Sequence, residues 1–137
     1  MNIIGFTTGV FDMFHIGHLN LLENAKSKCD FLVVGVNSDK LVSEYKSKNA
    51  VVPFEERLRI VSAMRCVDEA IRVDTLDKES IYMTKLFNVL FIGDDWKGSQ
   101  RWAETERVML TYGVRTIYLP YTRSTNSTLL REKLIEY

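Results

Sequence analysis

The chain has 137 residues, the usual size of one domain, and 46% of them are apolar, enough to build a buried core. Lys and Arg number 18, as do Asp and Glu, so a zero net charge disfavours broad binding to nucleic acid or anionic membranes. Two cysteines in no paired motif, Cys29 and Cys66, favour a reducing, cytoplasmic location. We expect no signal peptide, because the start of the sequence lacks a basic region followed by a long apolar run, and no membrane insertion, because no apolar run approaches the roughly 20 residues that span a bilayer.

Short β-rich runs alternate with segments of helical periodicity along the chain. Phe31–Val36 is almost continuously apolar, as a strand covered on both faces should be. Pro53 stands near the start of a helix, where its missing N–H does least harm, and Gly113 ends a later one. In chain order, the sequence predicts a strand at Ile3–Thr8, a helix at Gly17–Lys28, a strand at Phe31–Val36, a helix after Pro53 carrying Leu58, Ile60, Val61 and Met64, a strand at Glu69–Val73, a helix at Lys78–Phe87, a strand at Val89–Ile92, a helix at Trp102–Tyr112, a strand at Arg115–Leu119 and a last helix from Asn126 or Ser127 through Glu136.

Alternating strands and helices require crossover connections, which produce a parallel sheet covered by helices. The predicted fold is therefore α/β: a single doubly wound, Rossmann-like, five-stranded parallel sheet with helices on both faces, forming one domain over residues 1–137. Such sheets bind ligands beyond the carboxyl ends of their strands, where the strand order reverses. The residues after the first and fourth strands are the first candidates for a site.

The segment Thr8–His18 follows the first strand. Gly9 is expected to let the backbone turn tightly, and Gly17 to open a helix whose free N–H groups attract phosphate. His15 and His18 lie three residues apart, so both can face one spot near that helix start and donate to a phosphoryl group. The alternative roles are capping or packing. A zinc site is disfavoured because the chain has no other histidine and no nearby cysteine.

Three further groups of polar residues follow predicted strands. Asp95 and Trp96, after the fourth strand, form either an acidic turn or a site that accepts from a base amine and stacks on its ring. The basic side chains after the second strand are either solvated or bind phosphate. The loop after the fifth strand either caps the last helix or donates to phosphate. The basic side chains are Lys46, Lys48 and Arg57. The candidate residues of the loop after the fifth strand are Arg123, Thr125, Asn126, Ser127 and Thr128.

The chain resembles the cytidylyltransferase group of the nucleotidyltransferase superfamily. Gly9–His18 is similar to its G-x-F-D-x-x-H-x-G-H signature, which adenylyltransferases share, and Arg65–Glu69 is similar to its R-x-V-D-E segment. Gly93–Trp96 resembles the G-D-D-W segment of bacterial glycerol-3-phosphate cytidylyltransferases. The likeness runs from about Ile3 to about Leu134. One departure is that Tyr121 stands where the family usually has the Arg of R-T-E-G-I-S-T-T.

The resemblance implies a homodimer, with the R-x-V-D-E segment near the contact, and a role for each group of residues. The two histidines and the loop lysines contact phosphates, while the segment after the fourth strand reads cytosine. Asp12 either orients its loop or touches the metal. Taking the residue patterns and the resemblance together, the residues predicted to be catalytic are His15, His18, Lys46 and Arg123; those predicted to bind the nucleotide are Thr8, Gly9, Val10, Phe11, His15, His18, Asp95, Trp96, Thr125, Asn126, Ser127 and Thr128; and those predicted to bind the acceptor are Asp12, Lys46, Lys48 and Arg57.

The implied activity is transfer of CMP from CTP, bound with Mg²⁺, to a small alcohol phosphate, with release of pyrophosphate. Glycerol 3-phosphate is the favoured acceptor, which would give CDP-glycerol, a precursor of cell wall or capsule. No protein ligand is assigned to the metal, and no general base is assigned. Two alternatives stay open: an adenylyltransferase for a sugar phosphate and a nucleotide-binding regulatory module without turnover. A tRNA synthetase, which would share His-Ile-Gly-His, is disfavoured because the chain is short and lacks a Lys-Met-Ser-Lys-Ser loop.

Overall fold

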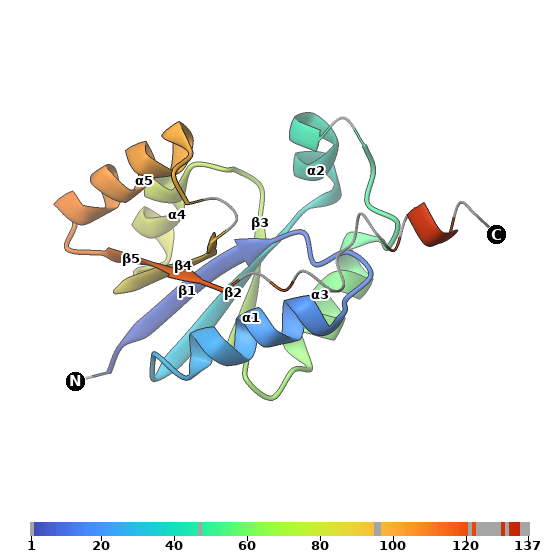
Figure 1. The fold of residues 1–137 in the computed structure, drawn as a ribbon, viewed down its shortest axis with the longest axis horizontal. Coiled ribbons are helices and arrows are strands. Elements are labelled where there is room, and N and C mark those ends of the chain that lie inside the picture. Colours follow the sequence, from blue (N-terminus) through green and yellow to red (C-terminus); the bar gives the residue numbers. More distant parts are fainter. Residues whose placement is uncertain are drawn as a thin grey trace.

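The computed structural model describes residues 2–46, 48–94, 97–120, 122, 130 and 132–134. Its centre is a five-stranded, wholly parallel sheet in the order β3-β2-β1-β4-β5 (Figure 1). The strands are β1 (Ile4–Gly9), β2 (Phe31–Asn37), β3 (Glu69–Val73), β4 (Val89–Gly93) and β5 (Arg115–Leu119). The strand order reverses between β1 and β4, so the switch point predicted from the sequence is confirmed.

Helices cover both faces of the sheet. The helices are α1 (Ile16–Lys26), α2 (Asp39–Lys46), α3 (Phe54–Ser62), α4 (Lys78–Thr84) and α5 (Gln100–Thr111). In Figure 1, α1 and α3 lie on one face, and α4 and α5 lie on the other. The doubly wound fold is therefore confirmed. In the described part of the chain, no helix is long and apolar enough to cross a membrane.

Side-chain alternation along the strands divides the core in two. In β2, Leu32, Val34 and Val36 join a cluster that includes Leu22 of α1 and Val61 of α3. Val33, with the opposite parity, joins the cluster on the α4 and α5 face. Because successive residues of a strand point to opposite faces, a strand that is apolar throughout supplies both cores.

The sequence missed one helix, α2. Residues 39–46 were expected to be loop, yet Leu41 and Val42 are buried and Tyr45 is partly buried on an eight-residue helix. The apolar residues at 41, 42 and 45 already have helical spacing, which was the signal overlooked. Lys46 is consequently the last residue of a helix and not a loop lysine.

Helix ends differ from the predictions by a few residues, as is usual at fraying termini. Helix α3 ends at Ser62, so Met64 lies beyond it, and α4 ends at Thr84. Gly113 follows α5 with a φ of 78°, a conformation that glycine adopts without steric conflict. Residues 132–134 are helical, but the caps proposed for the last helix, Asn126 and Ser127, lie outside the described residues.

Candidate active site

A cavity of about 810 Å³ opens at the carboxyl edge of the sheet, beside the end of β1. It gathers residues from the turn after β1, from α1, from α2 and from the segment that follows α2. Glu132 and Leu134, close to the carboxyl terminus, also line it. Among the predicted site residues, those on its wall are Thr8, Gly9, Val10, Phe11, Asp12, His18, Lys46 and Lys48. The fold therefore brings eight predicted residues to one cavity.

The two histidines cap helix α1. Nδ1 of His15 accepts from the Gly17 N–H at 3.0 Å, and Nδ1 of His18 accepts from the His15 N–H at 3.2 Å. The capping role that the sequence offered as an alternative is therefore real, and the Gly17 N–H is occupied instead of free. An imidazole whose Nδ1 accepts carries its proton on Nε2 when it is neutral. Capping thus fixes the tautomer and leaves both Nε2–H groups as donors.

The histidine rings are held neutral by their surroundings. They stack with centroids 3.9 Å apart. Burial lowers the pKa of His18 to about 3; the electrostatic effects of His15 and Lys46 act in the same direction, while Asp12 acts in the opposite direction. Burial also lowers the pKa of His15, whose Nε2 is buried with no hydrogen-bond partner in the described part of the chain. The pair therefore offers neutral, preorganised N–H donors.

The turn after β1 is strained at two positions. Phe11 and Met13 have φ values of 54° and 48°, in the left-handed region that non-glycine residues rarely adopt. Gly9 was expected to make the tight turn, but the left-handed residues are these two. The absence of a side chain at Gly9 instead makes room, since a Cβ there would lie 3.0 Å from the Phe11 ring. Strain of this kind concentrates at functional sites, where the surrounding contacts hold it.

Asp12 organises the loop that carries Lys48. It is 4% exposed, and its carboxylate oxygens accept from the N–H groups of Val51 and Val52 at 2.8 and 2.9 Å. Of the two roles left open by the sequence, this geometry provides the loop-orienting one. Contact with the acceptor stays a prediction.

Arg57 lies beneath the site and is only 1% exposed. Its guanidinium donates to the carbonyl oxygens of Val10, Asn37 and Val52 at 2.7–2.8 Å and pairs with Asp39 at 2.6 Å. These contacts tie together the loops that follow β1 and β2. The expected direct contact with the acceptor is disfavoured by this burial, and we assign Arg57 a positioning role.

Several predicted site residues cannot be placed. Asp95, Trp96, Arg123, Thr125, Asn126, Ser127 and Thr128 lie outside the described residues. The described residues include no group of three or more His, Cys, Asp or Glu side chains that could hold a metal ion. Mg²⁺ is commonly held by substrate phosphates with only one or two carboxylates. The metal expected with CTP stays a prediction.

A parallel sheet with a histidine-capped helix at its switch point is the architecture of a nucleotide-binding enzyme. Residues 6–133 match the model of the cytidylyltransferase-like family, and the chain belongs to that family. Its relatives are named as nucleotidyltransferases, so it is an enzyme of that class.

Individual relatives agree with this assignment. Over 129 residues the chain is 32% identical to the glycerol-3-phosphate cytidylyltransferase of Bacillus subtilis, covering 93% of this chain and 94% of that protein. It is 30% identical over 132 residues to the bifunctional protein HldE of Geobacter sulfurreducens, covering 96% of this chain but 26% of that protein. Among solved structures, the lipopolysaccharide core biosynthesis protein of Thermoplasma volcanium superposes with a TM-score of 0.75 at 26% identity, covering 91% of this chain and all of that one.

Proposed function

We propose that this enzyme transfers CMP from CTP to a small alcohol phosphate, with glycerol 3-phosphate as the favoured acceptor, and releases pyrophosphate. The observation that carries the proposal is the neutral, stacked histidine pair beside a cavity that also contains Lys46 and Lys48. The near full-length similarity to a glycerol-3-phosphate cytidylyltransferase supports the choice of nucleotide and acceptor. We further propose that the enzyme is cytoplasmic and homodimeric.

The chemistry follows from these groups. An oxygen of the acceptor phosphate attacks the α-phosphorus of CTP, forming the new P–O bond. The bond to the β-phosphate breaks, and its electron pair leaves with pyrophosphate. The acceptor phosphate is already ionised, so no general base is assigned. The histidine Nε2–H groups and Lys46 stabilise the charge that develops on the phosphate oxygens. Mg²⁺ bound with CTP would neutralise further negative charge.

A second candidate is an adenylyltransferase acting on a sugar phosphate. It is favoured by the relatives named HldE and by the structural neighbour named for lipopolysaccharide core biosynthesis, neither of which is named for glycerol phosphate. A regulatory module without turnover is a third possibility from the sequence. The described site retains His18, Lys46 and Lys48 on the cavity wall, with His15 stacked on His18, which argues against it.

The deciding measurement is pyrophosphate release across CTP, ATP, GTP and UTP, each with glycerol 3-phosphate and with a sugar 1-phosphate. The proposal expects CTP with glycerol 3-phosphate to give the highest kcat/KM. A preference for ATP with the sugar phosphate would replace it with the second candidate. Tight nucleotide binding without pyrophosphate release from any combination of nucleotide and acceptor would instead support the regulatory module without turnover.

A further inference from the structure

The cavity lies on one side of the switch point. Its described lining residues come from the end of β1, from α1, from α2 with the segment that follows it, and from the last helical residues of the chain. None of them comes from β4 or β5. The base of the nucleotide is expected near the residues that follow β4, so we expect this cavity to hold the reacting phosphates and the acceptor.

The cavity wall carries charges of both signs. Its charged side chains among the described residues are Lys46, Lys48, Asp12 and Glu132. The ring of His18 adds no charge near neutral pH, because its pKa is lowered to about 3. The described wall therefore has two positive and two negative side chains. The phosphates of a nucleotide and of an acceptor would together exceed the positive charge of the two lysines.

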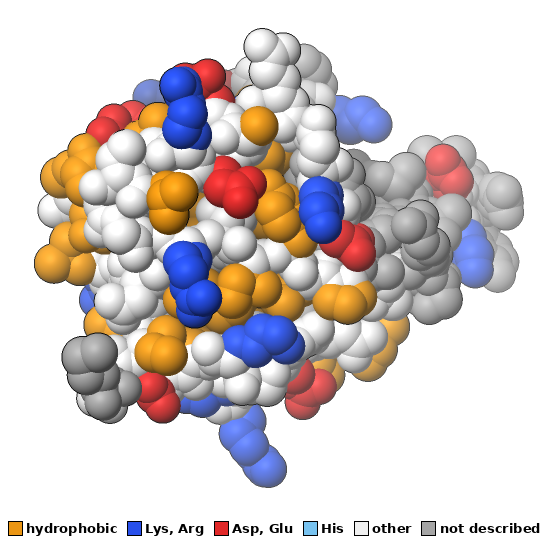
Figure 2. Space-filling model, turned by 60° about the vertical axis from the view of Figure 1, so that its left-hand side comes forward, with side chains coloured by type: hydrophobic (Ala, Val, Ile, Leu, Met, Phe, Trp, Pro, Cys, Tyr) orange, Lys and Arg blue, Asp and Glu red, His pale blue; other side chains and the backbone are white. Residues whose placement is uncertain are grey.

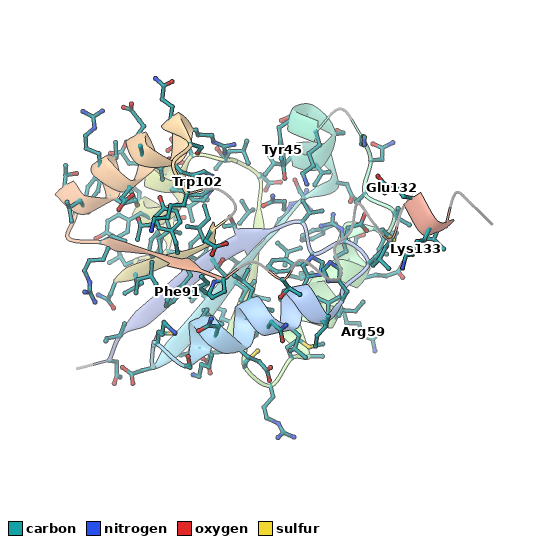
Figure 3. The ribbon with its side chains drawn as sticks, in the orientation of Figure 1. Tyr45, Arg59, Phe91, Trp102, Glu132 and Lys133 are labelled. Atoms are coloured by element: carbon teal, nitrogen blue, oxygen red, sulfur yellow. The ribbon has the colours of Figure 1, made fainter. Side chains whose placement is uncertain are left out.

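The two carboxylates on the wall differ in their surroundings. The carboxylate of Asp12 is buried and accepts from two backbone N–H groups. Glu132 is exposed on the cavity wall and forms no ion pair with a cation in the part of the chain that the structure describes. Figure 3 shows Glu132 beside the connection between α2 and α3, which carries Lys48. Glu132 thus places a negative charge beside the lysines of the site.

We propose that Glu132 determines acceptor specificity by rejecting acceptors that carry a second negative charge besides their phosphate. The inference rests on the nucleotidyl transfer proposed above. Once phosphates occupy Lys46 and Lys48, a further anion in the cavity meets Glu132 with no third lysine or arginine on the described wall to offset the repulsion. A hydroxyl group can instead donate to the carboxylate. The acceptor class is thus a phosphorylated polyol, not a phosphorylated hydroxy acid.

The test compares glycerol 3-phosphate with 3-phosphoglycerate, which differ only in that a hydroxymethyl group is replaced by a carboxylate. With CTP, the wild type should have the higher kcat/KM for glycerol 3-phosphate. Glu132→Gln keeps the size of the side chain but removes its charge. It should narrow the ratio of the two kcat/KM values about fivefold or more, the factor expected when two charges about 4 Å apart lose their repulsion even in water. Glu132→Lys should narrow the ratio further or reverse it.

The matched control is Glu44→Gln, which removes the same charge from an exposed position of α2 that is not among the lining residues, and it should leave the ratio unchanged. Calorimetric titration of each acceptor into the enzyme measures the same preference without turnover. A wild type that binds and uses both acceptors equally, or a Glu132→Gln variant with the wild-type ratio, would overturn the inference. Selective binding of glycerol 3-phosphate that Glu132→Gln weakens, without turnover from any nucleotide, would retain the role of Glu132 and reject the proposed reaction.

Discussion

At the scale of single residues, the two ring nitrogens of each histidine serve different purposes: one caps a helix, and the other is the donor in the proposed reaction. Nδ1 of each ring accepts from a backbone N–H at the start of α1. The opposite nitrogen, Nε2, is then fixed as a donor. Capping and phosphate stabilisation are therefore compatible, although the sequence presented them as alternatives. A substitution that keeps the hydrogen-bonding group at one of these positions and removes the group at the other can measure the contribution of each nitrogen to stability and to turnover.

We expect His18→Asn and His18→Gln to have opposite effects. Asparagine places an oxygen where Nδ1 accepts but has no group at the Nε2 position, so kcat should fall about 10²–10³-fold, the usual effect of losing one preorganised donor, with little change in Tm. Glutamine places an amide N–H at the Nε2 position but loses the cap, so part of kcat should remain while Tm falls. Steady-state kinetics and thermal melting of both variants provide the check.

Near-normal kcat in His18→Asn would reject a transition-state role for this donor. The same pair of substitutions at His15 provides a second measurement on the neighbouring ring. If both rings serve one phosphate, the double variant His15→Asn/His18→Asn should lose much less than the product of the two single effects, because groups that act as a unit are not additive.

At the scale of elements, the edge of the sheet is held together by an ion pair between the buried Arg57 and the more exposed Asp39. Asp39, the first residue of α2, accepts from the N–H of Phe54 at 3.1 Å and from Arg57 at 2.6 Å. The first of these contacts satisfies a donor at the start of α3, whose N-cap Pro53 offers no side-chain acceptor. The starts of α2 and α3 are thereby fixed to each other and to the loop after β1.

We predict that Arg57→Met lowers the free energy of unfolding by more than about 3 kcal/mol, because buried carbonyls that lose a donor cost about 1–3 kcal/mol each. Urea denaturation of the variant and the wild type would measure this difference in the free energy of unfolding. Arg59→Met, on the same helix, is the control and should change stability by less than about 0.5 kcal/mol, since Arg59 is exposed and points away from the sheet (Figure 3). A stable Arg57→Met with a raised acceptor KM would show direct acceptor binding instead.

At the scale of the whole molecule, the surface carries no single dominant charge. Figure 2 shows blue basic side chains among orange, white and red ones on the α4 and α5 side, so the coloured part of that face has no continuous basic surface. This agrees with the zero net charge and with the small-ligand chemistry of the site. The segment expected near a dimer contact makes internal contacts: Asp68 pairs with Lys26, and Glu69 with Lys85. The homodimer stays a prediction.

We predict that the fold loses stability between pH 6.5 and 4.5. An unfolded histidine binds a proton near pH 6.5, whereas folding lowers the pKa of His18 to about 3, so the unfolded state holds more protons throughout this window. One such group changes the free energy of unfolding by up to about 1.4 kcal/mol per pH unit. His18→Asn removes the titrating ring and should flatten the slope in urea unfolding curves. An unchanged slope would show that His18 is not buried as a neutral ring.

Below pH 4 other groups add to the effect. The pKa of Asp39 is lowered because the hydrogen bonds from Phe54 and Arg57, and the nearby arginine charges, outweigh burial, which alone would raise it. A carboxyl group with a lowered pKa contributes stability that is lost as the pH falls through that pKa. Above pH 4.5, the change in the free energy of unfolding with pH therefore reports on the histidines and not on these carboxyl groups.

The sequence by itself determined the order of strands along the chain, the parallel sheet and the location of the site. These features follow from local signals: continuous apolar runs define strands buried on both faces, and alternation with helices requires parallel crossovers. The Gly9–His18 motif marked the switch point because its chemistry lies within ten consecutive residues. Even α2 was readable from the spacing of Leu41, Val42 and Tyr45, although it was overlooked.

Only the tertiary structure decided which polar side chains line the cavity and which hold the protein together. Arg57, Lys46 and Lys48 look alike as basic residues in sequence, yet one is buried on three carbonyls and the others line the cavity. Lys78 attracted no notice in a helix, because its burial depends on Trp102, which is distant in sequence. The physical reason is that burial and hydrogen-bond partners depend on contacts between residues far apart in the chain, which local patterns do not encode.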